Sequence, residues 1–415
     1  MKNKLPLTSA HWGTYRARVS NGRVQELLAF EEDKDPSPIG PGIIDVQQGP
    51  TRIDAPMVRK SWLQGGPGHR PDLRGVDPFV EVSWEAANKL VAEELARVRS
   101  VYGNSSIFGG SYGWASAGRF HHAQSQLHRF LNCIGGYTKS KFTYSFAAAE
   151  AVVPHILGSY RAYLDTCTSW GSIRENTELF VCFGGVPLKN GQICQGGTGH
   201  HYQRENLIAA GEANINFVNI SPIKSDLLDQ VGGAWLAARP NTDVAILLGI
   251  AHTLQSEGLS DQLFLDQYTQ GFEEFHTYLM GETDGIAKTA EWAAHISEIP
   301  AQTIRELAIQ MAKKRTMISV SWSLTRQDHG EQAFWAVIAV ASMLGQIGLP
   351  GGGFGFGYSA VNYIGGQFTI LPFSAFPQGK NPVSDFIPVA RISDLLLMPG
   401  ESFDFDGKVY EYPDI

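Results

Sequence analysis

Short apolar segments that end in glycine, serine or tryptophan, separated by segments of helical length, constrain the fold of this chain most strongly. The strands are expected at residues 179–183, 215–220 and 317–321, and the helices at residues 201–210, 243–257 and 301–313. A strand, a helix and a second strand in this order favour parallel pairing with right-handed crossovers. The sequence therefore predicts a doubly wound parallel sheet.

In open sheets of this kind, ligands bind outside the carboxyl ends of the strands, where the strand order reverses. The residues that follow the expected strand ends, and would line this crevice, are Gly184, Gly185, Ser221, Pro222, Trp322 and Ser323. Each glycine pair is weak support by itself. Their number favours a large nucleotide-bearing ligand.

The chain has 415 residues, which is too long for one ordinary hydrophobic core. Asn21-Gly22 predicts the turn of a hairpin over residues 15–30, and Ser83 can cap a helix over residues 84–102. Residues 31–80 are rich in proline, glycine and charge, so little regular structure is expected there. We predict a multidomain α/β protein with an N-terminal β region (1–50), the first part of a second α/β domain (51–155), a dinucleotide-binding domain (156–330) and a truncated return into the second domain (331–415).

Composition excludes several classes of protein. The formal net charge of −8 argues against binding a phosphate backbone, so no nucleic acid partner is expected. The four cysteines are widely spaced, which favours a reducing compartment and gives no sign of a zinc ribbon or an iron–sulfur cluster. No export signal and no apolar stretch long enough for a membrane span are found, so we expect a cytoplasmic protein, or a periplasmic one if a signal has been trimmed.

The segment over residues 105–158 is unusually rich in glycine pairs that favour turns and in side chains that end in a hydroxyl or an indole N–H. A strand over residues 106–108 breaks at a glycine pair and delivers Ser111, Tyr112 and Trp114 from a turn, while Ser145 precedes an alanine-rich helix over residues 146–153. Two plainer interpretations stay open: Ser145 as a helix N-cap, and Tyr112 and Trp114 as core aromatics. The histidines near residue 121 lack further ligands at zinc spacing, and motifs of serine hydrolases, P-loop proteins and zinc proteases are missing.

Several segments together resemble the dimethyl sulfoxide reductase family of molybdenum enzymes, and within it the biotin sulfoxide reductase branch, with trimethylamine-N-oxide reductase nearby. These segments are SIFGGSYGW, GRFHHAQSQLHRFLNCIGGYT, TYS, AAAE, VNISPIKSD, TDVAILLGIAHTL, DGIAKTAEWAA and MLGQIGLPGGGFGFGY. They extend over nearly the whole chain.

The resemblance implies a bis(molybdopterin guanine dinucleotide) cofactor of molybdenum without an iron–sulfur cluster. Ser145 matches the family's metal ligand, and a hard oxygen donor suits a high-valent metal. Tyr112 and Trp114 match the aromatic pair beside the metal, where their O–H and N–H groups would donate to the substrate oxygen. The residues Lys139–Phe142, just ahead of the Tyr144-Ser145 pair, depart from the small or acidic residue that the family more often has.

For the dinucleotide, the resemblance and the strand ends agree on one set of residues. Lys189 and Lys224 would meet pyrophosphate charge, and Asp243 would accept hydrogen bonds from guanine. The cofactor-binding residues that we expect are Ser111, Tyr144, Gly185, Lys189, Ser221, Pro222, Lys224, Asp243, Trp322, Ser323, Arg326 and Gln327.

The activity implied is molybdenum-dependent reduction of a sulfoxide of the biotin sulfoxide or methionine sulfoxide type to a thioether. The expected partners are that small substrate, an external electron donor such as a reductase or a small redox protein, and a cofactor-insertion chaperone. Reduction of trimethylamine N-oxide or dimethyl sulfoxide is one alternative. The other is an inactive, truncated cofactor-binding fragment, because members of the resembled family are about twice as long.

Overall fold

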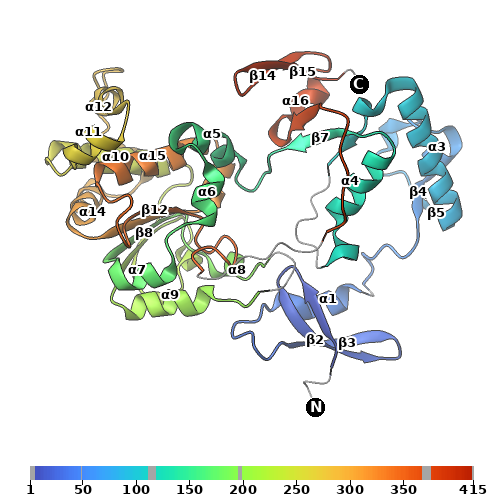
Figure 1. Ribbon diagram of the computed structural model, residues 1–415, viewed down its shortest axis with the longest axis horizontal. Coiled ribbons are helices and arrows are strands. Elements are labelled where there is room, and N and C mark those ends of the chain that lie inside the picture. Colours follow the sequence, from blue (N-terminus) through green and yellow to red (C-terminus); the bar gives the residue numbers. More distant parts are fainter. Residues whose placement is uncertain (1–4, 48, 111–117, 195–198, 367–374, 414–415) are drawn as a thin grey trace.

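The computed structural model describes residues 5–47, 49–110, 118–194, 199–366 and 375–413. Figure 1 shows a large α/β group on the left, a small sheet near the N-terminus below, and a second group of helices and strands on the right and at the top. The mixture of helices with parallel sheets and a small antiparallel sheet confirms the predicted fold class.

The large group is built on a five-stranded sheet with the order β10-β9-β8-β11-β12, in which every pair is parallel. The strands are β8 (Leu179–Phe183), β9 (Asn216–Ile220), β10 (Ala234–Leu236), β11 (Thr316–Val320) and β12 (Gly353–Phe356). β8 is buried along its whole length, as expected of an apolar strand covered on both faces. The chain first runs outward from β8 to β10 and then returns to β11, so the strand order reverses between β8 and β11.

Helices cover both faces of this sheet (Figure 1). One layer holds α7 (Trp170–Asn176), α8 (Leu188–Gly191) and α9 (Gln203–Glu212), and the other holds α10 (Asp243–Ser256), α13 (Ala290–Ser297), α14 (Ala301–Lys313) and α15 (Glu331–Met343). α10 packs against α13, α14 and α15, which explains why it is apolar almost all round. Around them lie α5 (Ala147–Leu157), α6 (Tyr160–Asp165), α11 (Gln262–Tyr268) and α12 (Phe272–Leu279).

The second group contains a three-stranded parallel sheet with the order β13-β7-β6. Its elements are β6 (Phe108–Gly109), β7 (Thr138–Lys141), β13 (Phe386–Pro388), α3 (Trp84–Tyr102), α4 (Ala123–Cys133), α16 (Ile392–Leu397), and the hairpin β14 (Ser402–Phe405) with β15 (Lys408–Glu411). β13 joins β7 from almost the far end of the chain. The Ser83 hydroxyl accepts from the backbone N–H of Ala86 and caps α3, as the sequence predicts.

The small sheet near the N-terminus consists of β1 (Leu7–Ala10), β2 (Gly13–Ser20) and β3 (Arg23–Ala29), all antiparallel. Asn21 and Gly22 have φ values of 52° and 72°, which confirms the predicted turn.

The expectation of little regular structure over residues 31–80 is wrong. That stretch contains α1 (Ile39–Val46), α2 (Lys60–Gly65) and the β4 (Met57–Arg59) strand, which pairs with β5 (Phe79–Glu81). The sheet of the large group also includes β12, which lies outside the range of 156–330 predicted for the dinucleotide-binding domain. The proposed domain boundaries stay a prediction.

Candidate cofactor-binding site

The turn after β8 lies at the point where the strand order reverses, and it requires glycine. Gly184 and Gly185 have φ values of 78° and 70°, a conformation that L side chains rarely adopt. A Cβ on Gly185 would lie 2.5 Å from the Asp226 Cβ and 2.7 Å from the Asp226 carbonyl oxygen. Glycine at position 185 therefore lets the turn after β8 pack directly against Asp226 at the carboxyl edge of the sheet.

Asp226 holds this turn in place, a role that was not predicted from the sequence. Its carboxylate accepts from the Ser221 hydroxyl at 2.8 Å and lies 3.4 Å from the Lys189 ammonium. The backbone N–H of Val186 donates to the Asp226 carbonyl at 2.8 Å. Gly185, Lys189 and Ser221, three residues expected to bind a dinucleotide, are thus brought together around one buried carboxylate. The available signal was a carboxylate two residues after Lys224, just beyond a strand end.

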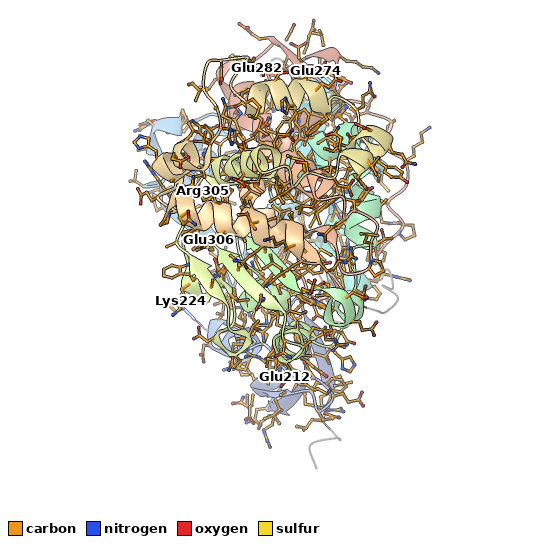
Figure 2. The ribbon with its side chains drawn as sticks, turned by 90° about the vertical axis from the view of Figure 1, so that its left-hand side faces the viewer. Glu212, Lys224, Glu274, Glu282, Arg305 and Glu306 are labelled. Atoms are coloured by element: carbon orange, nitrogen blue, oxygen red, sulfur yellow. The ribbon has the colours of Figure 1, made fainter. Side chains whose placement is uncertain are left out.

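Pro222 and Lys224 are not part of this cluster. Both are exposed, and within the described residues the Lys224 ammonium has no hydrogen bond or ion pair. Lys224 lines a separate hollow of about 190 Å³ with Asn219, Asp229 and Trp235. Figure 2 shows Lys224 on the outer face of the large group, below Arg305 and Glu306.

Asp243 is the first residue of α10, and its side chain is buried, with 8% of the residue exposed. Its carboxylate accepts one described side-chain hydrogen bond, from the Gln327 Nε2 at 3.4 Å. Burial raises the pKa of Asp243 above its ordinary value, against the opposing effect of Gln327. A buried carboxylate with so few donors has free acceptor capacity for a ligand that carries N–H groups.

The 3-10 turn η8 (Trp322–Arg326) follows β11 at the same edge. The Trp322 ring packs on Phe146, with ring centroids 4.3 Å apart, and its Nε1 is buried with no partner among the described residues. A Cβ on Gly357, after β12, would overlap this indole. Ser323 donates to the Ser321 hydroxyl at 2.9 Å.

Ser145 lies in the connection between β7 and α5, and the N-cap interpretation of it is wrong. α5 begins after Phe146, which occupies the N-cap position without a side-chain hydrogen bond. The backbone N–H of Ser145 donates to the Thr143 hydroxyl at 3.0 Å, and its carbonyl accepts from the Arg326 Nη1 at 2.8 Å. Arg326 therefore contacts the segment that carries Ser145, while Tyr144 donates from its hydroxyl to the Val389 carbonyl.

Ser111, Tyr112 and Trp114 lie outside the described residues, so their expected roles and the core alternative both stay predictions. Across the part of the chain that is described, no group of three or more His, Cys, Asp or Glu residues is arranged to hold a metal ion. The described helices also include none long and apolar enough to cross a membrane.

Comparison with known proteins identifies the family of this chain. The sequence matches the family model of molybdopterin oxidoreductase over residues 52–404 and the N-terminal domain of molybdopterin oxidoreductase over residues 8–47. Acetylene hydratase from Pelobacter acetylenicus has a similar fold, with a TM-score of 0.55 and 19% identity over 81% of this chain and 42% of that chain.

Curated relatives are similar over nearly the whole chain. A dimethyl sulfoxide/trimethylamine N-oxide reductase of Rhodobacter capsulatus is 42% identical over 100% of this chain and 51% of its own length. A biotin sulfoxide reductase of Cereibacter sphaeroides is 43% identical over 93% of this chain and 52% of its own length. A trimethylamine-N-oxide reductase of Haemophilus influenzae is 40% identical over 99% of this chain and 51% of its own length. The chain thus spans about half the length of these relatives, and it belongs to the molybdopterin oxidoreductase family.

Proposed function

We propose that the protein reduces a sulfoxide of the biotin sulfoxide or methionine sulfoxide type to a thioether. In this reaction the S–O bond breaks, and two electrons and two protons convert the oxygen to water. The observation that carries the proposal is Ser145, whose side chain does not cap α5 and whose backbone is tied to η8 at the carboxyl edge of the sheet. Its alkoxide is the hard oxygen donor expected of a molybdenum ligand.

The family supports a molybdenum–pterin cofactor, and we propose its bis(molybdopterin guanine dinucleotide) form, without an iron–sulfur cluster. When bound, this group supplies the two-electron chemistry that accepts oxygen from the substrate. Two features of the described residues support a guanine dinucleotide. Lys189 lies beside the turn at the carboxyl edge of the sheet, paired with Asp226 and largely exposed, where its ammonium could meet pyrophosphate. The under-satisfied Asp243 carboxylate would accept the N–H groups of guanine, held by Gln327.

The protein's own side chains would orient and polarise the substrate. Tyr112 and Trp114 would donate hydrogen bonds to the sulfoxide oxygen and so stabilise the charge that grows on it as the S–O bond breaks. Of the other expected contacts, the Trp322 N–H is buried without a partner among the described residues and would suit a ligand acceptor, and Ser323 lies beside it. Arg326 would act through Ser145, whose carbonyl it holds.

A second candidate is reduction of trimethylamine N-oxide or dimethyl sulfoxide. It is favoured by relatives with these names, which are about as similar to this chain as the biotin sulfoxide reductase is. For either activity we propose an external electron donor, assembly with a cofactor-insertion chaperone, and a cytoplasmic location.

The test is an assay of the purified protein with a reduced viologen as electron donor. Biotin sulfoxide, methionine sulfoxide, dimethyl sulfoxide and trimethylamine N-oxide are compared as substrates, with metal and guanosine monophosphate measured in the same preparation. We expect Ser145→Ala to lower turnover at least ~100-fold, because the metal's geometry depends on its ligand. Ser140→Ala, on the neighbouring strand, should retain activity.

Three results separate the alternatives. Faster turnover with the N-oxide than with the sulfoxides favours the second candidate. Protein that binds neither molybdenum nor guanosine monophosphate and has no turnover supports the inactive fragment. Full turnover by Ser145→Ala contradicts the assignment of the metal ligand.

A further inference from the structure

Residues 141–145, which end in Ser145, are held at both ends by contacts with distant parts of the chain. They leave β7 at Lys141 and enter α5 after Phe146. In Figure 1, the hairpin β14–β15 and α16 lie above the end of β7. The packing at the Lys141 end involves these late elements, although they are more than 240 residues away in sequence.

The Lys141 ammonium lies among three aromatic rings. Its distances to the ring centroids are 4.3 Å for Phe405, 4.8 Å for Phe386 and 5.6 Å for Phe142. A cation over the face of an aromatic ring within about 6 Å is attracted by the ring quadrupole. No ion pair of Lys141 is found in the described parts of the chain, where its ammonium contacts these three rings.

The same rings surround a bend in the backbone at Phe142. Phe142 has a φ of 64°, which is an unfavourable conformation for a bulky residue and persists only where the surroundings impose it. Its ring packs on Phe405 with centroids 5.7 Å apart, and Pro388 of β13 pairs with Lys141 in the sheet. Phe142 is thus the bend through which the chain leaves β7 toward Ser145.

At the other end, polar contacts complete the attachment. Tyr144 donates to the Val389 carbonyl, so the late segment holds the chain a second time. The Thr143 hydroxyl accepts from the Ser145 N–H at 3.0 Å, and Arg326 donates to the Ser145 carbonyl at 2.8 Å. The direction of the Ser145 side chain therefore depends on a backbone that is attached to two separate parts of the fold.

We propose that Lys141 is a positioning residue for Ser145: its ammonium, bound by the three rings, fixes the left-handed turn from which Ser145 reaches the metal. This inference rests on the proposed role of Ser145 as a metal ligand. It assigns a function to the unusual Lys139–Phe142 stretch, in which Lys141 is caged and Lys139 is exposed.

The test compares variants of the molybdenum-loaded holoenzyme. Lys141→Gln removes the charge, Phe405→Leu removes the nearest ring and keeps the charge, and Lys141→Arg retains a cation for the cage. Lys139→Gln is the matched control, because it removes the same charge two residues earlier. The readouts are metal content, the electron paramagnetic resonance signal of the partly reduced molybdenum centre, and kcat.

We expect normal metal content in all four variants. Lys141→Gln and Phe405→Leu should both broaden or split the resonance signal and lower kcat about tenfold, because a displaced ligand distorts the metal site. Lys141→Arg should restore the native signal, and Lys139→Gln should leave it unchanged. If Lys141→Gln fails to load metal, the comparison of Phe405→Leu with the control Lys139→Gln still tests the proposal.

Two results would overturn the positioning role. A change in Lys141→Gln that Phe405→Leu does not reproduce would mean that the charge acts on the metal directly. An unchanged signal in both, while Ser145→Ala alters it, would mean that the cage does not place the ligand. An unchanged signal in Ser145→Ala would instead remove the ligand assignment itself, so the two failures are distinguishable.

Discussion

At the residue scale, the most informative group is the Asp243 carboxyl. It begins α10 but is buried, and its one described side-chain hydrogen bond is long. Burial disfavours the charged form more strongly than Gln327 supports it, so the pKa of this group is raised above its ordinary value of 3.8. A site that keeps such a group without a full set of donors is suited to a ligand that brings them.

Asp243→Asn should raise the melting temperature of the cofactor-free protein at neutral pH. A raised pKa in the folded state means that the folded protein binds this proton more tightly than the unfolded chain does. The stability that Asp243 contributes is therefore fully present below pH 3.8 and is lost as the pH rises through the folded-state pKa. Asparagine does not titrate, so the variant avoids this loss.

The measurement is thermal unfolding of both proteins between pH 4 and pH 8, with the exposed Asp229→Asn as control. The gap between Asp243→Asn and the wild type should be largest at high pH and close toward pH 4. A gap that is independent of pH would show that titration of Asp243 is not its cause.

At the scale of single elements, the helices and strands whose start and stop signals lie next to them in the sequence could be predicted. α3 occupies the expected residues because a serine cap and a glycine stop lie next to it in sequence. β8 is a continuous apolar run, and its bounds are those expected. Gly185 and Ser221 were predicted for the same reason, because each lies within two residues of the end of an apolar strand and is of a type that favours turns.

Elements that depend on distant packing could not be predicted. α1 contains Pro41 and two glycines, which weaken a helix, yet it forms against β3, and a Cβ on Gly40 would overlap the ring of Tyr15. β12 has the sequence GFGF, which indicates a loop until β11 pairs with it. The role of Asp226 was missed likewise, because its contacts with Gly185 and Lys189 join residues about 40 positions apart in the sequence.

At the scale of the whole molecule, a buried pair joins the N-terminal region to the large group. The His201 Nδ1 lies 2.7 Å from the Asp33 carboxylate, and its Nε2 lies 2.7 Å from the Gln192 carbonyl. Only 1% of the His201 side chain and 4% of the Asp33 side chain are exposed. Both ring nitrogens thus face acceptors, and both donate when the imidazole is protonated.

His201→Ala should lower the free energy of unfolding by about 3 kcal/mol, because it leaves the Asp33 carboxylate buried without its partner. The measurement is urea unfolding at neutral pH. His200→Ala is the control: the His200 ring lies 2.9 Å from the Glu32 carbonyl and stacks on Tyr202 but faces no buried charge, so its loss should cost about 1 kcal/mol. Equal losses in the two variants would contradict a special role for the buried pair.

X-ray absorption at the molybdenum edge of the loaded protein, wild type against Ser145→Ala, tests directly whether Ser145 binds the metal. If the Ser145 oxygen binds the metal, the variant should lose one oxygen neighbour from the coordination shell while the sulfur neighbours remain. An identical shell in the two proteins would show that the Ser145 oxygen is not a ligand of the metal.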